Sequence, residues 1–303
     1  MLERENIGQP EGMETPKPTP YVVSEDIKLL LQDWTEKRGF NLPKPEFFIE
    51  LRDEFKSYMG QIFAGFELVP ETELLEGIRE RVEKSGLFPV SLDKVYFRSE
   101  PSLDITRLVD EAGKDRGLGK RAGTPSLLRQ FRALKESGVN EVVLVDDVIF
   151  TGDLVRRTGK LLERMGVRVP MVCAGIGIVE GIEQLNGFGQ EVSCVREYEE
   201  VVDEICERDF YPGVPMCGRS LQGDENTGVP YILPFGNPGK WASIPTEWQE
   251  PLSRFCIGQT IKLFEAIEEK SGRYVKCQDL ERAVVGLPQA DTRFVEELRK
   301  YKY

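Results

Sequence analysis

The sequence predicts an α/β protein in which a central parallel sheet carries helical additions on its N- and C-terminal sides. From about residue 93 to residue 195, short apolar stretches alternate with stretches of helical periodicity. This alternation is typical of a parallel sheet with right-handed crossovers. One stretch, residues 142–147 (VVLVDD), shows no polar alternation before its two aspartates. Strands of this kind are covered on both faces, as in parallel sheets.

The chain has 303 residues, more than an average domain, and we expect four segments along it. Residues 1–20, where four prolines lie among polar residues, are expected to form a disordered tail. A helical region over 21–88, an α/β core over 89–222, and a loop and helical region over 223–303 follow.

Helical periodicity predicts the elements outside the core, and their apolar stripes are expected to pack inward. A first helix begins near Ser24, and Thr246 is the expected N-cap of a long C-terminal helix. The other expected elements are helices at 45–64, 71–84, 246–270, 278–286 and 291–301, with a proline-rich loop at 229–245.

Inside the core, strands and helices are expected to alternate. In chain order we expect a strand at 94–99, a helical stretch after Pro101, a basic glycine-rich loop at 113–126, a helix at 125–137, the apolar strand ending at Asp146, a helix at 154–165, a strand near 168–178, a short helix, a strand around 191–195 and a helix at 197–205.

The most informative segment is residues 142–154 (VVLVDDVIFTGDL). Ligands bind at the carboxyl ends of strands in open α/β sheets, where Asp146 and Asp147 should lie. The Thr151-Gly152 turn opens a helix whose first N–H groups lack intrahelical partners, so a phosphate is a natural ligand there. Gly152 lets the backbone approach such a group closely. The alternative is purely structural, because acids and Thr-Gly are also common at ordinary turns.

This segment resembles the phosphoribosyl-pyrophosphate signature of type I phosphoribosyltransferases: apolar residues, two acids, two apolar residues and a Thr-Gly loop. The resemblance covers residues 89–222 and implies a phosphoribosyltransferase-like core. It implies that Asp146 and Asp147 hold the ribose, and that the loop of Thr151, Gly152 and Asp153 binds the 5-phosphate.

The activity implied is transfer of 5-phosphoribosyl from phosphoribosyl pyrophosphate to an acceptor, with release of pyrophosphate. Mg²⁺ would be the cofactor, carried by the substrate rather than ligated directly by the protein.

Phe150, Asp153 and Leu154 depart from the family's loop and leave an alternative open. In this alternative the chain is a non-catalytic sensor or regulatory protein that binds a nucleotide or sugar phosphate. A third alternative is a hydrolase that uses water as the acceptor.

Two basic segments are further candidates by resemblance. Arg98 and Ser99 occupy the place of the family's pyrophosphate loop, although Arg98 is equally expected to pair with Glu100 or another carboxylate. Lys120 and Arg121 lie where the family has a flexible catalytic loop that stabilises departing pyrophosphate. The alternative for this loop is a solvated basic turn.

Residues 208–220 (RDFYPGVPMCGRS) are too rich in Pro, Gly and aromatic residues for a regular element. By resemblance, Phe210 or Tyr211 would stack on a flat acceptor, with Asp209 or Arg219 reaching a polar edge. The alternative is an aromatic plug that locks a proline turn.

The amino-acid composition argues against several classes of binding partner and catalytic group. The net charge of −12 and pI near 4.9 argue against nucleic acid or an anionic membrane as partner, and no apolar run spans a bilayer. The chain has no histidine, so any proton transfer must use a carboxylate, Lys, Tyr, Cys or water. Most of the six dispersed cysteines are expected to be buried thiols.

The first residues resemble neither a secretory signal nor a transit peptide, and we expect a cytoplasmic protein with a small-molecule phosphoribosyl substrate. Residues 223–303 form a hood, a homodimer surface or a separate module, and the sequence does not choose between these roles.

Overall fold

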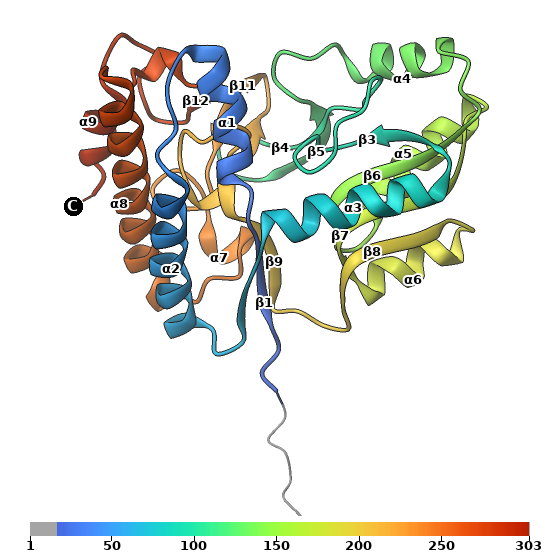
Figure 1. Cartoon of the computed structure of the whole chain (residues 1–303), viewed down its shortest axis with the longest axis horizontal. Coiled ribbons are helices and arrows are strands. Elements are labelled where there is room, and N and C mark those ends of the chain that lie inside the picture. The colour runs from blue at the N-terminus through green and yellow to red at the C-terminus, as the bar shows by residue number, and fades with distance from the viewer. Residues whose placement is uncertain (1–16, 303) are drawn as a thin grey trace, which may run out of the picture.

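A computed structural model of the protein describes residues 17–302, so the tail expected over 1–20 lies largely outside the described residues. The central sheet has four parallel strands in the order β3 (Phe88–Ser91), β6 (Glu141–Ile149), β7 (Arg168–Ile178) and β8 (Glu191–Tyr198). These strands and their connecting helices form one half of the molecule (Figure 1). The predicted α/β class with a parallel core sheet is confirmed.

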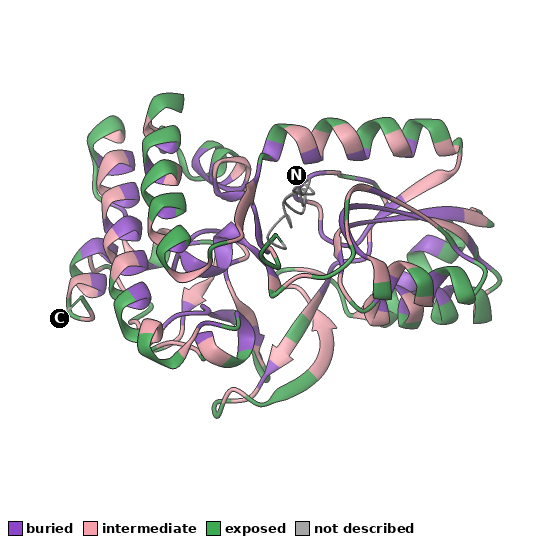
Figure 2. Ribbon diagram, turned by 90° about the horizontal axis from the view of Figure 1, so that it is seen from below, coloured by how far each residue is buried: buried purple, intermediate pink, exposed green. Residues whose placement is uncertain are grey.

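Helices cover both faces of this sheet. α3 (Glu71–Ser85) packs on one face, and α5 (Asp153–Arg164) and α6 (Val179–Gly187) pack on the other (Figure 2). Alternate residues of β6 therefore enter different cores: Val143 joins the cluster that contains α3, whereas Leu144 joins the cluster that contains α5. This explains why the strand has no polar alternation.

A second sheet joins the N-terminal region to the core. It consists of β2 (Phe66–Val69), β1 (Tyr21–Ser24) and β9 (Asp203–Cys206), all parallel. The helix expected near Ser24 begins later, as α1 (Ile27–Arg38), and α2 (Pro45–Ile62) is confirmed. The prediction of a helix at 197–205 is wrong, because the first residues of this segment end β8 and its last residues belong to β9.

A third, mixed sheet has the strand order β12, β11, β10, β4 and β5. Two strands of this sheet correct predictions from the sequence. The stretch after Pro101, expected to be helical, forms β4 (Ile105–Val109), and the basic loop contains β5 (Asp115–Lys120), which is antiparallel to β4. A side chain on Gly119 would lie only 2.7 Å from Leu108 Cδ1, so glycine lets this hairpin close. The remaining strands are β10 (Arg219–Leu221), β11 (Asp224–Val229) and β12 (Ala283–Val284).

The strand expected at 94–99 is also wrong. The pairing strand lies earlier, at β3, and the following residues form a loop held by side-chain hydrogen bonds, such as Ser91 Oγ to the Phe97 carbonyl (2.8 Å). These polar side chains bond to local backbone instead of leaving it free to pair with another strand.

The C-terminal region is mainly helical and lies beside α1 and α2 (Figure 1). The long helix is confirmed as α8 (Thr246–Ser271), but Thr246 is its first residue and Pro245 takes the N-cap position. The helix expected at 278–286 is instead a short 3-10 helix, η2 (Cys277–Asp279), followed by β12. The other helices are α4 (Leu127–Glu136), η1 (Glu207–Phe210), α7 (Pro238–Trp241) and α9 (Phe294–Arg299).

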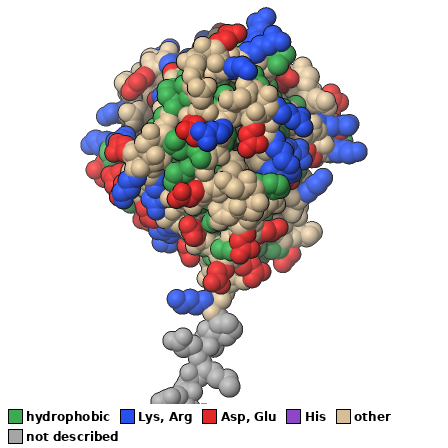
Figure 3. All heavy atoms as spheres, turned by 90° about the vertical axis from the view of Figure 1, so that its right-hand side faces the viewer, with side chains coloured by type: hydrophobic (Ala, Val, Ile, Leu, Met, Phe, Trp, Pro, Cys, Tyr) green, Lys and Arg blue, Asp and Glu red, His purple; other side chains and the backbone are tan. Residues whose placement is uncertain are grey.

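All six cysteines are buried free thiols, as expected. Between residues 17 and 302, no helix combines the length and apolarity needed to cross a bilayer. On the face formed by the core sheet and its helices, acidic and basic side chains are interspersed (Figure 3).

Candidate functional site

The acidic pair lies within β6 and not at its end. β6 continues two residues past Asp147, to Ile149, because Val148 and Ile149 still pair with β7. The turn that follows leads into α5, whose N-cap is Gly152 with a φ of +73°. This conformation favours glycine.

The signature loop packs closely against α6. A Cβ on Gly181 would lie 2.4 Å from the Phe150 carbonyl oxygen, and a Cβ on Gly152 would lie 3.0 Å from the Gly181 carbonyl oxygen. Both contacts require glycine, because the two backbones touch directly. The position of the loop is therefore set by α6 as well as by its own strand and helix.

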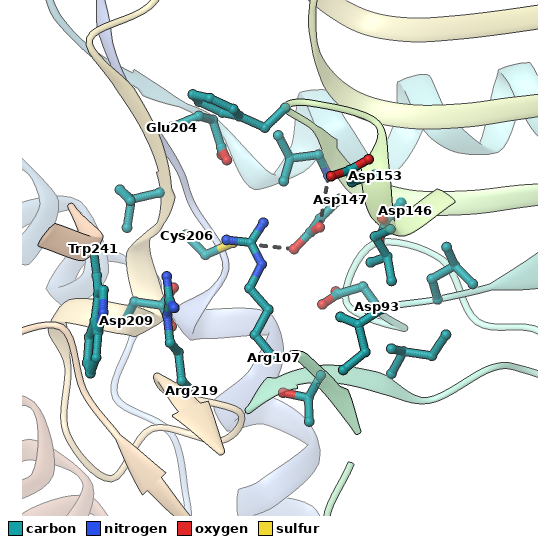
Figure 4. Close-up of a pocket in the computed structure, with 18 of the residues that line it drawn as sticks. Asp93, Arg107, Asp146, Asp147, Asp153, Glu204, Cys206, Asp209, Arg219 and Trp241 are labelled. Atoms are coloured by element: carbon teal, nitrogen blue, oxygen red, sulfur yellow. Dashed lines mark hydrogen bonds between the residues drawn. The ribbon is translucent and has the colours of Figure 1, made fainter. Parts of the chain in front are cut away.

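A cavity of about 510 Å³ opens at this edge of the sheet (Figure 4). This volume is within the usual range for small-molecule sites. It is lined by six of the residues singled out from the signature and the basic loop, namely Arg121, Asp146, Asp147, Thr151, Gly152 and Asp153. The structure thus brings together residues from β6, the start of α5 and the segment after β5.

The two signature aspartates have different surroundings. Asp147 accepts hydrogen bonds from Arg208 Nη2 (3.0 Å) and Cys206 Sγ (3.3 Å) through Oδ2, and from the Val148 N–H (2.8 Å) through Oδ1. Within residues 17–302, no ion pair engages the Asp146 carboxylate, whose polar neighbour is the Asp147 N–H; it is 6% exposed and lines the cavity. Asp146 is therefore the signature carboxylate that is free to meet a ligand.

Arg208 is the centre of a buried ionic cluster. Its guanidinium contacts Asp26 (2.5 Å), Asp93 (3.1 Å) and Asp147 (3.0 Å), which come from three separate parts of the chain. A second arginine, Arg121, also reaches Asp93 at 3.0 Å. The two arginines tie the end of β3 and the middle of β6 to the segment that precedes α1.

This cluster separates the pKa values of the signature pair. Burial raises the pKa of Asp146 well above its usual range, and the carboxylates of Asp147 and Asp93 raise it further. Burial also opposes ionisation of Asp147, but Arg208 and the Cys206 hydrogen bond outweigh it and lower the pKa of Asp147. Two adjacent carboxyls with opposite shifts are a common feature of sites that hold or move protons.

At the helix-start loop, the Asp153 N–H donates a long hydrogen bond to Thr151 Oγ1 (3.4 Å). The Asp153 carboxylate accepts a hydrogen bond from Arg156 Nη2 at 2.6 Å and is thereby neutralised by its own helix. Thr151 is exposed at the cavity, and α5 directs its positive N-terminal end toward the same space.

Of the two basic residues expected to be catalytic, the structure brings only one to the cavity. Arg121 lines it, whereas Lys120, the last residue of β5, does not. Alternation along the hairpin accounts for this difference, since neighbouring residues of an extended segment point to opposite sides.

Arg98 and Ser99 lie outside the cavity. Arg98 forms an ion pair with Asp33 of α1, and its side chain is 59% exposed. Ser99 Oγ accepts a hydrogen bond from the Ser91 N–H (2.7 Å) and donates one to the Pro101 carbonyl (2.9 Å). Both side chains therefore bind structural partners. They do not reach the ligand edge of the sheet, because no strand ends at residue 99.

Phe210 and Tyr211 do not line the cavity either. Both side chains are 0% exposed and belong to the main hydrophobic core, where Phe55 of α2 contacts each ring at 5.6 and 6.1 Å between centroids. The two rings fill the core, in agreement with the alternative prediction of an aromatic plug, and neither ring is accessible for stacking on an acceptor. Asp209 and Arg219, from the same segment, do line the cavity.

Several cavity residues were missed from the sequence. Asp93 follows β3 by two residues, and Arg107 projects from β4 in a stretch expected to be helical. Arg208 lies in the segment where Asp209, Phe210, Tyr211 and Arg219 were singled out but Arg208 was not. A polar residue soon after each apolar strand was the available signal for Asp93, whereas Tyr231 and Trp241 reach the cavity from a distant loop with no local signal.

No family model matches the chain, and no curated protein matches it. Three solved structures resemble part of it. Orotate phosphoribosyltransferase from Aeropyrum pernix is 16% identical with a TM-score of 0.25, over 42% of this chain and 69% of its own. UMP synthase from Leishmania donovani is 14% identical with a TM-score of 0.26, over 41% of this chain and 26% of its own. Adenine phosphoribosyltransferase from Rhodothermus marinus is 17% identical with a TM-score of 0.24, over 41% of this chain and 77% of its own.

These TM-scores are low, and the geometry of the chain itself defines the fold. Four parallel strands carry helices on both faces, and β6 leads through an acidic pair and a Thr-Gly turn into α5. The core of the chain is a parallel α/β fold with additions on both sides.

Proposed function

We propose that the protein catalyses magnesium-dependent transfer of a 5-phosphoribosyl group from phosphoribosyl pyrophosphate to an acceptor. One observation carries this proposal: the Asp146 carboxylate and the N-terminal end of α5 line the same cavity as Arg107 and Arg121. A sugar phosphate with an anionic leaving group matches these features: a hydroxyl for Asp146, a phosphate for the helix N-terminus and a negative charge for the two arginines.

The reaction breaks the bond between ribose C1 and the pyrophosphate oxygen, and pyrophosphate leaves with the electron pair. A lone pair on the acceptor forms the new bond to C1, and the acceptor's proton is released to water. Positive charge develops on the sugar and negative charge on the leaving group, so fixed positive groups lower the barrier. Arg107 and Arg121 would supply this charge, while Asp146 would hold a ribose hydroxyl.

Arg107 is suited to this role because its side chain lines the cavity. Its side chain is exposed at the cavity, and no ion pair holds its guanidinium in the part of the chain that the structure describes. Arg121, by contrast, is shared with Asp93. We therefore assign the leaving group chiefly to Arg107.

The donor set fits Mg²⁺ as part of the substrate. The described residues contain no group of three or more Cys, Asp or Glu side chains arranged to hold a metal, whereas the Asp146 carboxylate lines the cavity, where it would meet a substrate-bound ion. When bound to the diphosphate, Mg²⁺ would neutralise charge on the leaving group.

Calorimetric titration with phosphoribosyl pyrophosphate, with and without Mg²⁺, tests the proposal. We expect Mg²⁺-dependent binding, weakened at least about tenfold by Asp146→Asn, because an amide is a poorer partner for a ribose hydroxyl than a carboxylate. The amide has nearly the same size and shape as the carboxyl it replaces, so the variant should remain folded.

Glu163→Gln is the matched control, because it removes one negative charge from an exposed position on α5. It should bind the substrate like the parent protein. Absence of Mg²⁺-dependent binding in the parent protein, or equal affinity in Asp146→Asn, would contradict the proposal.

A further inference from the structure

The outer surface of α4 and α5 is basic, although the protein as a whole is acidic. The two helices carry seven Lys and Arg side chains against three Asp and Glu, whereas the net charge of the chain is −12. Exposed arginines elsewhere pair with nearby acids, as Arg254 does with Glu250 on α8. Arg129, Arg132 and Arg164 are exposed too, but no carboxylate pairs with them within residues 17–302. This surface therefore carries positive charge that the described residues do not neutralise.

Two large apolar side chains lie exposed among these cations. Leu128 of α4 is 59% exposed, and Leu161 of α5 is 45% exposed. Lys135 is seven residues after Leu128, so both project from the same side of α4. Lys135 Nζ donates to the Met165 carbonyl at the end of α5 (2.6 Å), so this side of α4 faces α5.

Leu161 faces α4 in turn. On the other flank of α5, Arg156 and Lys160 lie over the ring of Phe188, the C-cap residue of α6, at 5.7 and 4.9 Å from its centroid. Leu161 lies about 140° around the helix from Arg156, at about 100° per residue. The two leucines thus border one seam between α4 and α5, above the buried core that the two helices share. We call this surface the α4–α5 face: Leu128, Arg129, Arg132, Lys135, Leu161 and Arg164.

The α4–α5 face does not suit a second copy of the chain, a nucleic acid or a membrane. In a twofold dimer through one face the same patch meets itself, so each cation would lie against cations of the other copy. A nucleic acid would pair its phosphates with the arginines but would leave both leucines without apolar contacts. An anionic membrane would attract this face but repel most of the remaining surface of an acidic chain.

An acidic amphipathic segment of another protein matches both the charge and the leucines. Protein interfaces combine a buried apolar centre with a charged rim, and the two leucines have arginines of both helices beside them. The seam between two packed helices is also a shape that a third helix fits. Apolar residues on one side of such a helix would cover the seam, while its carboxylates would pair with the arginines.

We propose that the α4–α5 face docks an acidic amphipathic helix of a partner protein. Its apolar side chains would lie over Leu128 and Leu161, and its carboxylates would meet Arg129, Arg132 and Arg164. No residue of this face lines the cavity, so the docking is independent of the proposed phosphoribosyl transfer.

Fluorescence anisotropy with three labelled peptides tests the docking. The first is a helical peptide of about 15 residues, rich in Glu and with Leu at helical spacing. The second replaces its Glu residues with Gln, and the third replaces its Leu residues with Ser. We expect the first to bind at least about tenfold more tightly than the others, and more weakly as salt is added.

Variants of the protein locate the docking site. The double variant Arg132→Glu and Arg164→Glu should weaken binding of the acidic peptide at least about tenfold. Leu161→Ser should weaken it about fivefold, because an apolar contact is lost while the charge is unchanged. The matched control is the double variant Lys37→Glu and Lys56→Glu, which reverses two exposed lysines of α1 and α2 that have no ion pair within the described residues.

Circular dichroism should show that all three variants are folded, since every changed side chain is exposed. Absence of binding by the acidic peptide at low salt, equal binding of the three peptides, or equal loss in the charge-reversed variant and its control overturns the proposal. Tighter binding of a single-stranded RNA oligonucleotide or of phosphatidylserine vesicles than of the acidic peptide also overturns it, in favour of a nucleic-acid or membrane surface.

Discussion

Arg208 shows how one buried side chain shapes the whole site. It neutralises Asp26, Asp93 and Asp147 together, and it is only 6% exposed. Breaking a buried ion pair leaves uncompensated charges and typically costs about 3–5 kcal/mol. We therefore expect Arg208→Met to lower the free energy of unfolding by about this amount at neutral pH, measured by urea denaturation.

The pH dependence identifies the cause of that loss. Asp147 has a lowered pKa in the folded protein, so its ion pair contributes stability above the ordinary pKa of an aspartate, and this stability is lost as pH falls through the lowered value. The deficit of Arg208→Met should thus shrink in acid. The control is Arg156→Met, since its partner Asp153 is half exposed and the pair should contribute only about 0–1 kcal/mol. A loss in Arg208→Met that does not change with pH would indicate a packing defect instead.

Glu25 predicts a second pH effect of opposite sign. Burial raises its pKa from 4.5 to about 7, with Glu207 and Glu71 adding to the shift and Arg52 opposing it. Between these values the folded protein binds more protons than the unfolded chain, so stability falls as pH rises from 4.5 to about 7. In Glu25→Gln the free energy of unfolding should fall less steeply with pH over this window. The difference in slope corresponds to the binding of at most about one proton. Identical slopes for the two proteins, measured by denaturation at several pH values, would rule out this role for Glu25.

At the scale of elements, the contact between α6 and the signature loop is the most sensitive. A methyl group on Gly181 would lie 2.4 Å from the Phe150 carbonyl oxygen, so Gly181→Ala must displace either the helix or the loop. Overpacking of this kind costs about 1–3 kcal/mol. We expect a lower thermal unfolding midpoint and weaker substrate binding.

Gly187 gives a control within the same helix. A Cβ there meets nothing within 4 Å, so Gly187→Ala should leave binding unchanged and should not destabilise the protein. If the two alanine variants behave alike in calorimetry, the loop is not positioned by α6.

The elements that the sequence predicted well are those whose own periodicity decides them. α2, α3, α8 and the β6–α5 unit have long apolar patterns, and their bounds differ from expectation by only a few residues. The short strands β1, β4 and β9 were missed or taken for helices, because four or five residues of mixed character form strands only when distant partners supply the hydrogen bonds.

The same distinction applies to the site. Asp146, Asp147, Thr151 and Gly152 were predictable because strand, turn and helix start are contiguous in sequence. Arg107 and Arg208 reach the cavity through pairings that span many residues, so no local pattern marks them. Phe210 shows the converse error, since a composition typical of a binding loop here fills the core.

At the scale of the whole molecule, the additions on both sides are integral to the site. β1 lies between β2 and β9, so residues near position 21 hold the strand that leads to Cys206 and Arg208. Tyr21 extends this link, because its hydroxyl donates to the Ala242 carbonyl at 2.7 Å, next to Trp241. Asp26, which pairs with Arg208, also comes from the N-terminal region. The N-terminal region, the core and the C-terminal region thus meet around one cavity.

This arrangement predicts that residues 89–222 do not fold alone, although they contain the signature. Without β1, β9 loses a partner strand. Without Asp26, Arg208 loses its fully buried carboxylate partner. Without α2 and α8, Phe210 and Tyr211 lose the core in which they are 0% exposed. Each side chain of that size contributes about 3–5 kcal/mol when buried, and total domain stability is only about 5–15 kcal/mol. We expect the fragment to lack a cooperative urea transition by circular dichroism, whereas a chain of residues 17–302 should show a single one. A cooperative transition in the fragment would mean that the central sheet is an independent domain and that the additions merely dock onto it.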